Sequence, residues 1–315
     1  MLYIIDIQAG QAQQSLPDKQ IFKNGVAVMS LEGSAYALGA GTVINAIATW
    51  KGAAFGIDLK TYADVTLSKD KRSVRGTIEA MPDADTTLIE RSVQYVLDHF
   101  DLKMGGTVAT RSEVPLASGL KSSSAAANAT ILATLDAIGE EMEPVEAVRL
   151  GVRAAKDAGV TITGAFDDAC ASFFGGFVVT DNKELELVKR TEGRSQVLIF
   201  APDERSFSSS TNVERSKLIA PWVDIAYGLS LEGEYERAMT LNGFLYCNAL
   251  GFDTEFLMRA LELGVKGVSL SGTGPSYVAL VDKRSADALK SAWQDCGVSG
   301  TLICTKINNR GASKL

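Results

Sequence analysis

The segment Pro115–Ala127 reads Pro-Leu-Ala-Ser-Gly-Leu-Lys-Ser-Ser-Ser-Ala-Ala-Ala and joins a predicted strand, 107–113, to an alanine-rich predicted helix, 122–138. Gly119 lets this loop come close to a ligand. The serines fall where the first turn of the helix presents unpaired N–H groups and positive potential. The segment therefore predicts a phosphate site, with Lys121 against the polyphosphate. A serine-capped helix after a turn is the alternative.

Spacing excludes the Walker type of phosphate loop. That loop has a glycine directly before Lys-Ser, whereas Leu120 stands between Gly119 and Lys121. A second glycine-rich turn, Ser271-Gly-Thr-Gly-Pro-Ser276, lies between two predicted strands and lacks the third glycine of a dinucleotide fingerprint. Its backbone is predicted to meet phosphates or the substrate, and an ordinary tight turn is the alternative.

Two adjacent acids, Asp167 and Asp168, stand in an otherwise apolar stretch of small residues, Thr161–Cys170. Burying a carboxylate is costly unless it has a partner or a task. One of the two acids is therefore expected to accept a proton from a substrate hydroxyl or to hold magnesium. A cap on a loop or helix is the alternative for both.

Composition limits the class of protein. The 315 residues are 46% hydrophobic and 22% charged, which is ordinary for a globular protein of about two domains. The net charge is −7 and no long basic run occurs, so a nucleic-acid partner is not expected. The four cysteines are widely spaced and His99 is the only histidine, so neither zinc nor disulfides are expected. No signal peptide is recognised, and no stretch approaches the roughly 18 apolar residues of a membrane helix. We therefore expect a cytoplasmic location and no association with a membrane.

The order of predicted elements indicates an α+β fold of two lobes with a cleft between them. Residues 1–24 are expected to be an extension, 25–193 a first lobe that carries the predicted phosphate site and 194–315 a second lobe. Residues 25–65 have a strand-like pattern. Within it the run Gly33–Gly41 suits close backbone packing or a ligand that approaches the main chain, and a core helix is the alternative. Helices are predicted near 85–100, 144–158, 231–250, 254–263 and 285–296, and strands near 177–180, 197–200, 268–270, 277–281 and 300–307.

The three motifs together resemble the kinase superfamily named after galactokinase, homoserine kinase, mevalonate kinase and phosphomevalonate kinase (GHMP). Its loop pattern is Pro-x-x-x-Gly-Leu-Gly-Ser-Ser-Ala-Ala; here Lys121 replaces a glycine and Ser124 replaces an alanine. The resemblance implies a ribosomal-protein-S5-like N-terminal lobe, a ferredoxin-like C-terminal lobe and Asp167 as the catalytic residue. It implies an ATP-binding role for Pro115, Gly119, Leu120, Lys121, Ser122, Ser123, Ser124, Ala125, Gly272 and Gly274.

Five segments are similar to one subgroup, the archaeal shikimate kinases, from about Gly25 to Gly311. They are Gly33–Asn45, Lys51–Asp58, Ser118–Ser124, Thr163–Ala169 and Lys306–Gly311. Lys121 and Ser124 agree with this subgroup. The resemblance implies transfer of a phosphoryl group from ATP, with Mg²⁺, to shikimate as the small-molecule partner. Another kinase of the superfamily, such as homoserine kinase, and a non-catalytic nucleotide- or sugar-binding sensor are the alternatives.

Two parts of the site remain open at this stage. The superfamily often carries a magnesium-binding glutamate on the helix before the catalytic aspartate, and here Ala155 or Lys156 stands there. Ser123 or Ser122 is expected to ligate the metal, with Asp157 and Asp168 as further candidates. The substrate carboxylate needs a cationic partner, for which the candidates are Arg153, Lys51, Arg310, Lys60 and Arg205.

Overall fold

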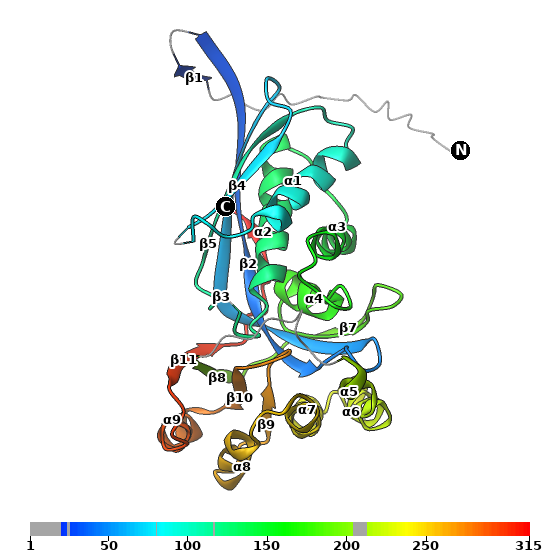
Figure 1. Cartoon of the computed structure of the whole chain (residues 1–315), viewed down its shortest axis with the longest axis vertical. Coiled ribbons are helices and arrows are strands. Elements are labelled where there is room, and N and C mark those ends of the chain that lie inside the picture. The colour runs from blue at the N-terminus through cyan, green and yellow to red at the C-terminus, as the bar shows by residue number, and fades with distance from the viewer. Residues whose placement is uncertain (1–19, 24–25, 80, 116, 204–212) are drawn as a thin grey trace, which may run out of the picture.

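The computed structural model describes residues 20–23, 26–79, 81–115, 117–203 and 213–315, with side chains from Ser30 onward. These residues form two sheets, each with helices packed against it, in two lobes along the long axis of the molecule (Figure 1). The predicted α+β class with two lobes is confirmed. The second sheet begins with strand β8 (Gln196–Pro202), and the lobe boundary between residues 193 and 194 stays a prediction.

The first sheet is eight-stranded, with the order β1-β2-β3-β5-β4 and three more strands attached to it. β12 pairs with β2, and β6 pairs with both β3 and β7. The chain end therefore returns to the first lobe. The strands are β1 (Gln20–Lys23), β2 (Val26–Ile44), β3 (Lys51–Ser68), β4 (Val74–Ile78), β5 (Gly105–Ser112), β6 (Phe177–Asp181), β7 (Glu186–Thr191) and β12 (Ser313–Lys314).

Helices α1 to α4 cover one face of this sheet (Figure 1). Gly33–Gly41 is part of strand β2, so its strand reading is confirmed and the core-helix alternative is wrong. The small residues let helix α2 approach, because a Cβ on Gly33 would lie 2.3 Å from the Ala133 carbonyl oxygen. The helices are α1 (Thr87–His99), α2 (Ser122–Ile138), α3 (Pro144–Asp157) and α4 (Phe166–Phe174).

The predicted extension, residues 1–24, falls mostly outside the described part of the chain. Of its residues the structure describes 20–23, which form strand β1 and pair antiparallel with the start of β2. Residues 1–19 and 24 lie outside the description. The boundary of this segment at residue 24 stays a prediction.

The second sheet has the order β11-β8-β10-β9, and α7, α8 and α9 pack against it. The helix expected near 231–250 is confirmed as α7, which begins four residues later, at Tyr235. Leu231 and Glu232 belong to the end of α6, which Gly233 terminates in a left-handed conformation. The remaining elements are α5 (Val213–Lys217), α6 (Ala220–Glu232), α7 (Tyr235–Leu250), α8 (Glu255–Glu262), α9 (Lys283–Gln294), β9 (Gly267–Leu270), β10 (Tyr277–Val281) and β11 (Gly300–Lys306).

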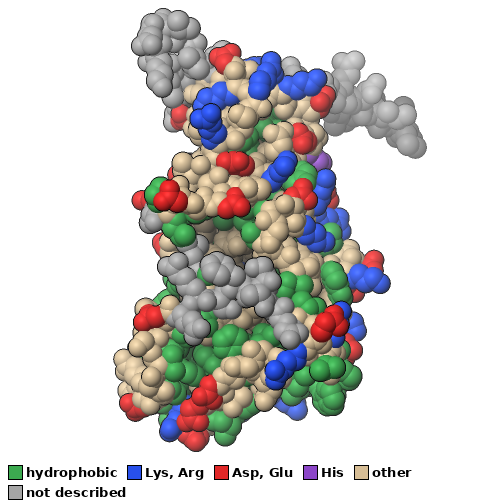
Figure 2. All heavy atoms as spheres, viewed as in Figure 1, with side chains coloured by type: hydrophobic (Ala, Val, Ile, Leu, Met, Phe, Trp, Pro, Cys, Tyr) green, Lys and Arg blue, Asp and Glu red, His purple; other side chains and the backbone are tan. Residues whose placement is uncertain are grey.

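The charged side chains are scattered over both lobes. On the face shown in Figure 2, Lys and Arg alternate with Asp and Glu, and no continuous basic area is visible. Among the described residues no helix is both long enough and apolar enough to span a bilayer. The four cysteines form no disulfide; Cys170 and Cys247 are buried in the core, where they act as small apolar side chains.

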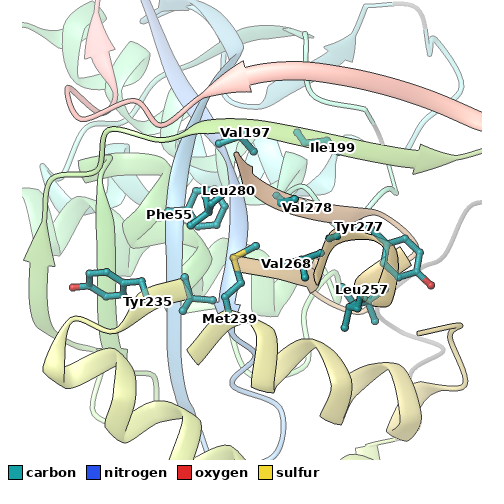
Figure 3. Packing of buried hydrophobic residues seen from close by; sticks show 14 of the residues in the cluster. Phe55, Val197, Ile199, Tyr235, Met239, Leu257, Val268, Tyr277, Val278 and Leu280 are labelled. Atoms are coloured by element: carbon teal, nitrogen blue, oxygen red, sulfur yellow. The ribbon is translucent and has the colours of Figure 1, made fainter. Parts of the chain in front are cut away.

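One buried cluster joins the two lobes. Strands β2 and β3 are long enough to extend from the first sheet into the second lobe, where Phe55 belongs to the same core as Val197, Met239 and Leu280 (Figure 3). Burial of this apolar surface is the main force that holds the lobes together. The shared core therefore fixes how the two predicted glycine-rich loops lie relative to each other.

Candidate active site

The predicted phosphate loop lies directly before helix α2. Gly119 and Lys121 both have positive φ, +80° and +66°, which turns the chain sharply so that the helix begins at Ser122. The cap residue Lys121 makes no side-chain hydrogen bond to the helix start. The serine-capped alternative is therefore wrong in its main feature: the residue at the cap is a lysine. The first-turn N–H groups, with three serine hydroxyls beside them, are arranged as in other anion sites at helix ends.

The second glycine-rich turn packs against this loop. The Ser271 hydroxyl donates to the Gly119 carbonyl oxygen (2.9 Å), and the Ser276 N–H donates to the Ser118 carbonyl oxygen (3.2 Å). The approach is so close that a Cβ on Gly119 would lie 2.2 Å from the Ser271 carbonyl oxygen. Two loops from opposite lobes thus form one wall.

Two buried polar residues at the end of β2, Thr42 and Asn45, hold the second glycine-rich turn in place. The Thr42 hydroxyl accepts the Gly272 N–H (2.8 Å), and Asn45 Nδ2 donates to the Gly272 carbonyl oxygen (2.8 Å). The Asn45 N–H in turn donates to Asn242 Oδ1 on α7 (3.0 Å). Thr42 and Asn45 also line the cavity described below. Their roles were not predicted, because the sequence gives no sign that this strand end meets a turn more than two hundred residues away.

The two adjacent acids occupy the first turn of α4. Asp168 forms an ion pair with Lys121 (Nζ to Oδ1, 3.1 Å), and the two side chains are only 14% and 7% exposed. Asp167 is 4% exposed and its Oδ1 accepts a hydrogen bond from Asn182 Nδ2 (2.7 Å). Because they are adjacent in sequence, the two carboxylates cannot separate, and each raises the cost of ionising the other.

Burial sets the protonation of this pair. Burial, and after it the charge of Asp168, raise the pKa of Asp167 to about 7, against the opposing effects of Lys121 and Asn182. Burial also raises the pKa of Asp168, while Lys121 opposes the shift. A carboxylate whose pKa lies near neutrality is suited to take a proton from a substrate and return it to solvent.

These groups share one cavity of about 390 Å³ between the lobes. Its polar wall is formed by the two loops and α4, and an apolar wall carries Ile78, Met81 and Val160. A cavity with one apolar side and converging polar groups is typical of a small-molecule site. The predicted site residues that line it are Gly119, Lys121, Ser122, Ser123, Ser124, Asp167, Asp168 and Gly272.

Comparison with known proteins places the chain in a family. Residues 87–176 match the GHMP kinases N terminal domain, and residues 233–299 match the GHMP kinases C terminal domain. A shikimate kinase of Methanococcoides burtonii is 72% identical over 91% of this chain and 100% of its own length. The chain belongs to the archaeal shikimate kinases, within the GHMP kinases. The predicted family resemblance is confirmed.

Further comparisons agree with this assignment. A shikimate kinase of Methanosarcina mazei is 66% identical over 90% of this chain and 97% of its own length. The galactokinase of Lactococcus lactis, solved with galactose, has a TM-score of 0.72 at 16% identity, covering 90% of this chain and 95% of that one. At such low identity the likeness shows the fold alone. The enzyme is thus a GHMP-type kinase, and kinases of this family use ATP.

Four of the predicted ATP-binding residues support the loops from behind the cavity wall. Leu120 is buried and its carbonyl oxygen accepts the Ala40 N–H (3.1 Å), and Ala125 is fully buried on α2. The Pro115 carbonyl oxygen accepts the Ser118 hydroxyl (2.8 Å). Gly274 has positive φ and packs against the Phe252 ring. In this geometry they shape the loops, and direct contact with a nucleotide stays a prediction for each.

Three of the cationic candidates for the substrate carboxylate contact other side chains. Arg153 lies over the Tyr95 ring, and Asp157, a metal candidate, accepts a hydrogen bond from the Tyr95 hydroxyl. Lys51 pairs with Asp224 on α6 (3.0 Å). Lys60 lies over the Tyr36 ring, Arg310 is exposed in the turn after β11, and Arg205 falls outside the described residues. Among the described residues the cavity wall carries Lys121 as its one cation.

Gly52, which lies in the segment Lys51–Asp58 and was assigned no role from the sequence, limits where Asp167 lies. A Cβ on Gly52, at the start of β3, would lie 2.6 Å from Cγ and 2.7 Å from Oδ2 of Asp167. The carboxylate therefore rests against the bare backbone of this strand. No side chain larger than hydrogen fits there unless Asp167 moves.

We expect Gly52→Ala to lower kcat by roughly 100-fold and to leave the KM for ATP unchanged, because a displacement near 1 Å misaligns the reacting groups. Steady-state kinetics measure both constants. Gly228→Ala on α6 is the matched control, since a Cβ there meets nothing within 4 Å, and it should keep wild-type kinetics. Wild-type kcat in the Gly52 variant would show that the carboxylate position does not matter.

Proposed function

We propose that the enzyme transfers the γ-phosphoryl group of ATP to a hydroxyl of shikimate, giving shikimate 3-phosphate. The observation that carries this is the 72% identity to a shikimate kinase across that relative's whole length. The cavity supports it, because a helix start suited to phosphates and a buried carboxylate with a raised pKa line the same space. In a biosynthetic role of this kind the enzyme would act in the cytoplasm.

In this proposal the triphosphate lies along the start of α2. The N–H groups of Ser122, Ser123 and Ser124 and the positive end of the helix would bind the β- and γ-phosphates. Lys121 would add charge, and Gly272 would approach from the opposite lobe. The apolar wall beyond the loop would take the base of the nucleotide.

The residues also fit a magnesium ion. Asp168 Oδ1 is buried and at ion-pair distance from Lys121, yet no aligned hydrogen bond satisfies it. The described residues include no cluster of three or more acidic, His or Cys ligands. Mg²⁺ typically takes one or two protein oxygens and completes its shell with phosphates and water. Asp168 with the Ser122 or Ser123 hydroxyl would hold it, and when bound it would neutralise charge on the phosphates.

Asp167 would take the proton in the transfer step. The substrate oxygen attacks the γ-phosphorus, the bond from that phosphorus to the ADP oxygen breaks, and the hydroxyl proton passes to the carboxylate. Oδ1 is engaged by Asn182, so we assign the proton to Oδ2, which lies against Gly52. Positioning and charge neutralisation supply most of the rate in such reactions.

The test is ADP release from purified enzyme with ATP and Mg²⁺, with shikimate, homoserine, mevalonate and galactose offered separately. We expect release with shikimate alone, because the identity is to shikimate kinases over nearly the whole chain. Release with homoserine or another acceptor would show that shikimate is not the substrate, while the assignment as a kinase would stand. ATP binding without any turnover would favour the alternative function, a non-catalytic nucleotide- or sugar-binding sensor.

A further inference from the structure

Asn182 is a buried amide directly after strand β6. It is 1% exposed, and its N–H donates to the Trp50 carbonyl oxygen (2.7 Å). It belongs to none of the three sequence motifs, so the sequence assigned it no role. A buried amide needs partners for both its oxygen and its nitrogen.

Its orientation follows from the partners. The Asp167 N–H points at the Asn182 side chain (3.2 Å) and can only donate, so the atom that it meets is Oδ1. The Thr180 hydroxyl also donates to Oδ1 (2.7 Å). Nδ2 is therefore the atom that faces the carboxylate, and it donates to Asp167 Oδ1 at 2.7 Å.

One side chain thus holds Asp167 at two points. The oxygen binds the backbone N–H of Asp167, and the nitrogen binds its carboxylate. The bond to the backbone also replaces a missing cap, because Ala165 at the start of α4 makes no side-chain cap hydrogen bond. Two anchors on one short residue leave its side chain little freedom to rotate. A carboxamide provides the required donor and acceptor together, which an aspartate or a leucine does not.

We propose that Asn182 is a positioning residue for the phosphoryl transfer: it holds Oδ1 of Asp167 and leaves Oδ2 for the substrate hydroxyl. The inference rests on the proposed function, in which Asp167 takes the proton. Asn182 itself touches neither substrate nor phosphate in this arrangement; it acts through Asp167.

The experiment compares Asn182→Leu with Asn128→Leu. Asn128 is an equally buried amide that also holds α4, through the Ala169 carbonyl oxygen (2.9 Å), and it does not contact the carboxylate. We expect Asn182→Leu to lower kcat roughly 10- to 100-fold and to leave the KM for ATP unchanged, because only the reacting carboxylate is misaligned. Asn128→Leu should lower stability and keep the wild-type kcat. A wild-type kcat in Asn182→Leu would overturn the proposal.

A double-mutant cycle separates this inference from the proposed function. In an Asp167→Asn background, Asn182→Leu should cost no further activity; an equal loss in both backgrounds would mean a structural role and overturn the inference. Near-normal turnover in Asp167→Asn alone would instead overturn the proposed function of Asp167. If Asn182→Leu does not fold, Thr180→Val keeps the amide and removes its orienting donor, and kcat should again fall while the KM for ATP stays unchanged.

Discussion

Asp167→Asn is expected to lower kcat by on the order of 10² to 10⁴-fold, the usual contribution of a positioned general base. The asparagine keeps the size of the side chain and the contact with Gly52, but it cannot accept the proton. The KM for ATP should change little, because in the proposed arrangement the phosphates lie at the start of α2. Steady-state kinetics with shikimate and ATP varied separately measure both effects.

The pH profile is the control for this interpretation. Activity needs the ionised carboxylate, and burial raises the pKa of Asp167 to about 7, so wild-type kcat/KM should fall as the pH drops through that region. The residual activity of Asp167→Asn should lack this acid limb. A variant that is slow yet keeps the limb would assign the titration to another group, and a variant with nearly normal turnover would remove Asp167 from the mechanism.

The local structure around the candidate site follows from local sequence. The predicted phosphate loop depends on one glycine, one turn and one helix start, all within Pro115–Ala127, and helix α2 begins at Ser122 as predicted. The pair Asp167–Asp168 was recognised because two acids in an apolar stretch are costly without a task. In both cases the residues that form the feature lie within a few positions of one another in the sequence.

The parts that depend on distant contacts were not predicted. Asn182 and Gly52 matter only because β3 and the end of β6 meet α4, and neither has a local pattern that sets it apart. For the same reason the sequence left five cationic side chains as candidates for the partner of the substrate carboxylate. A long cationic side chain reaches several neighbours, so only the fold shows that Arg153 lies over Tyr95 and Lys51 pairs with Asp224.

Lys121→Met is expected to destabilise the enzyme by about 3 kcal/mol, because it leaves Asp168 as an unpaired charge in a nearly buried position. Urea unfolding measures the loss. Lys51→Met is the matched control, since its pair with Asp224 is 42% and 49% exposed, and an exposed pair contributes about 0–1 kcal/mol. Equal losses in the two variants would mean that burial of the Lys121–Asp168 pair has no energetic consequence.

The double variant Lys121→Met/Asp168→Asn separates the two tasks of the lysine. Removing both charges restores much of the stability, because no buried charge is left without a partner. ATP affinity, measured by calorimetry without Mg²⁺ and without an acceptor so that the loss of Asp168 as a metal ligand does not contribute, should still be roughly 10- to 100-fold weaker than in the wild type, the value of a charged hydrogen bond to phosphate. Recovery of both stability and ATP affinity would limit Lys121 to its ion pair. Recovery of stability alone would place its ammonium group on the phosphates, where the superfamily pattern has only a glycine.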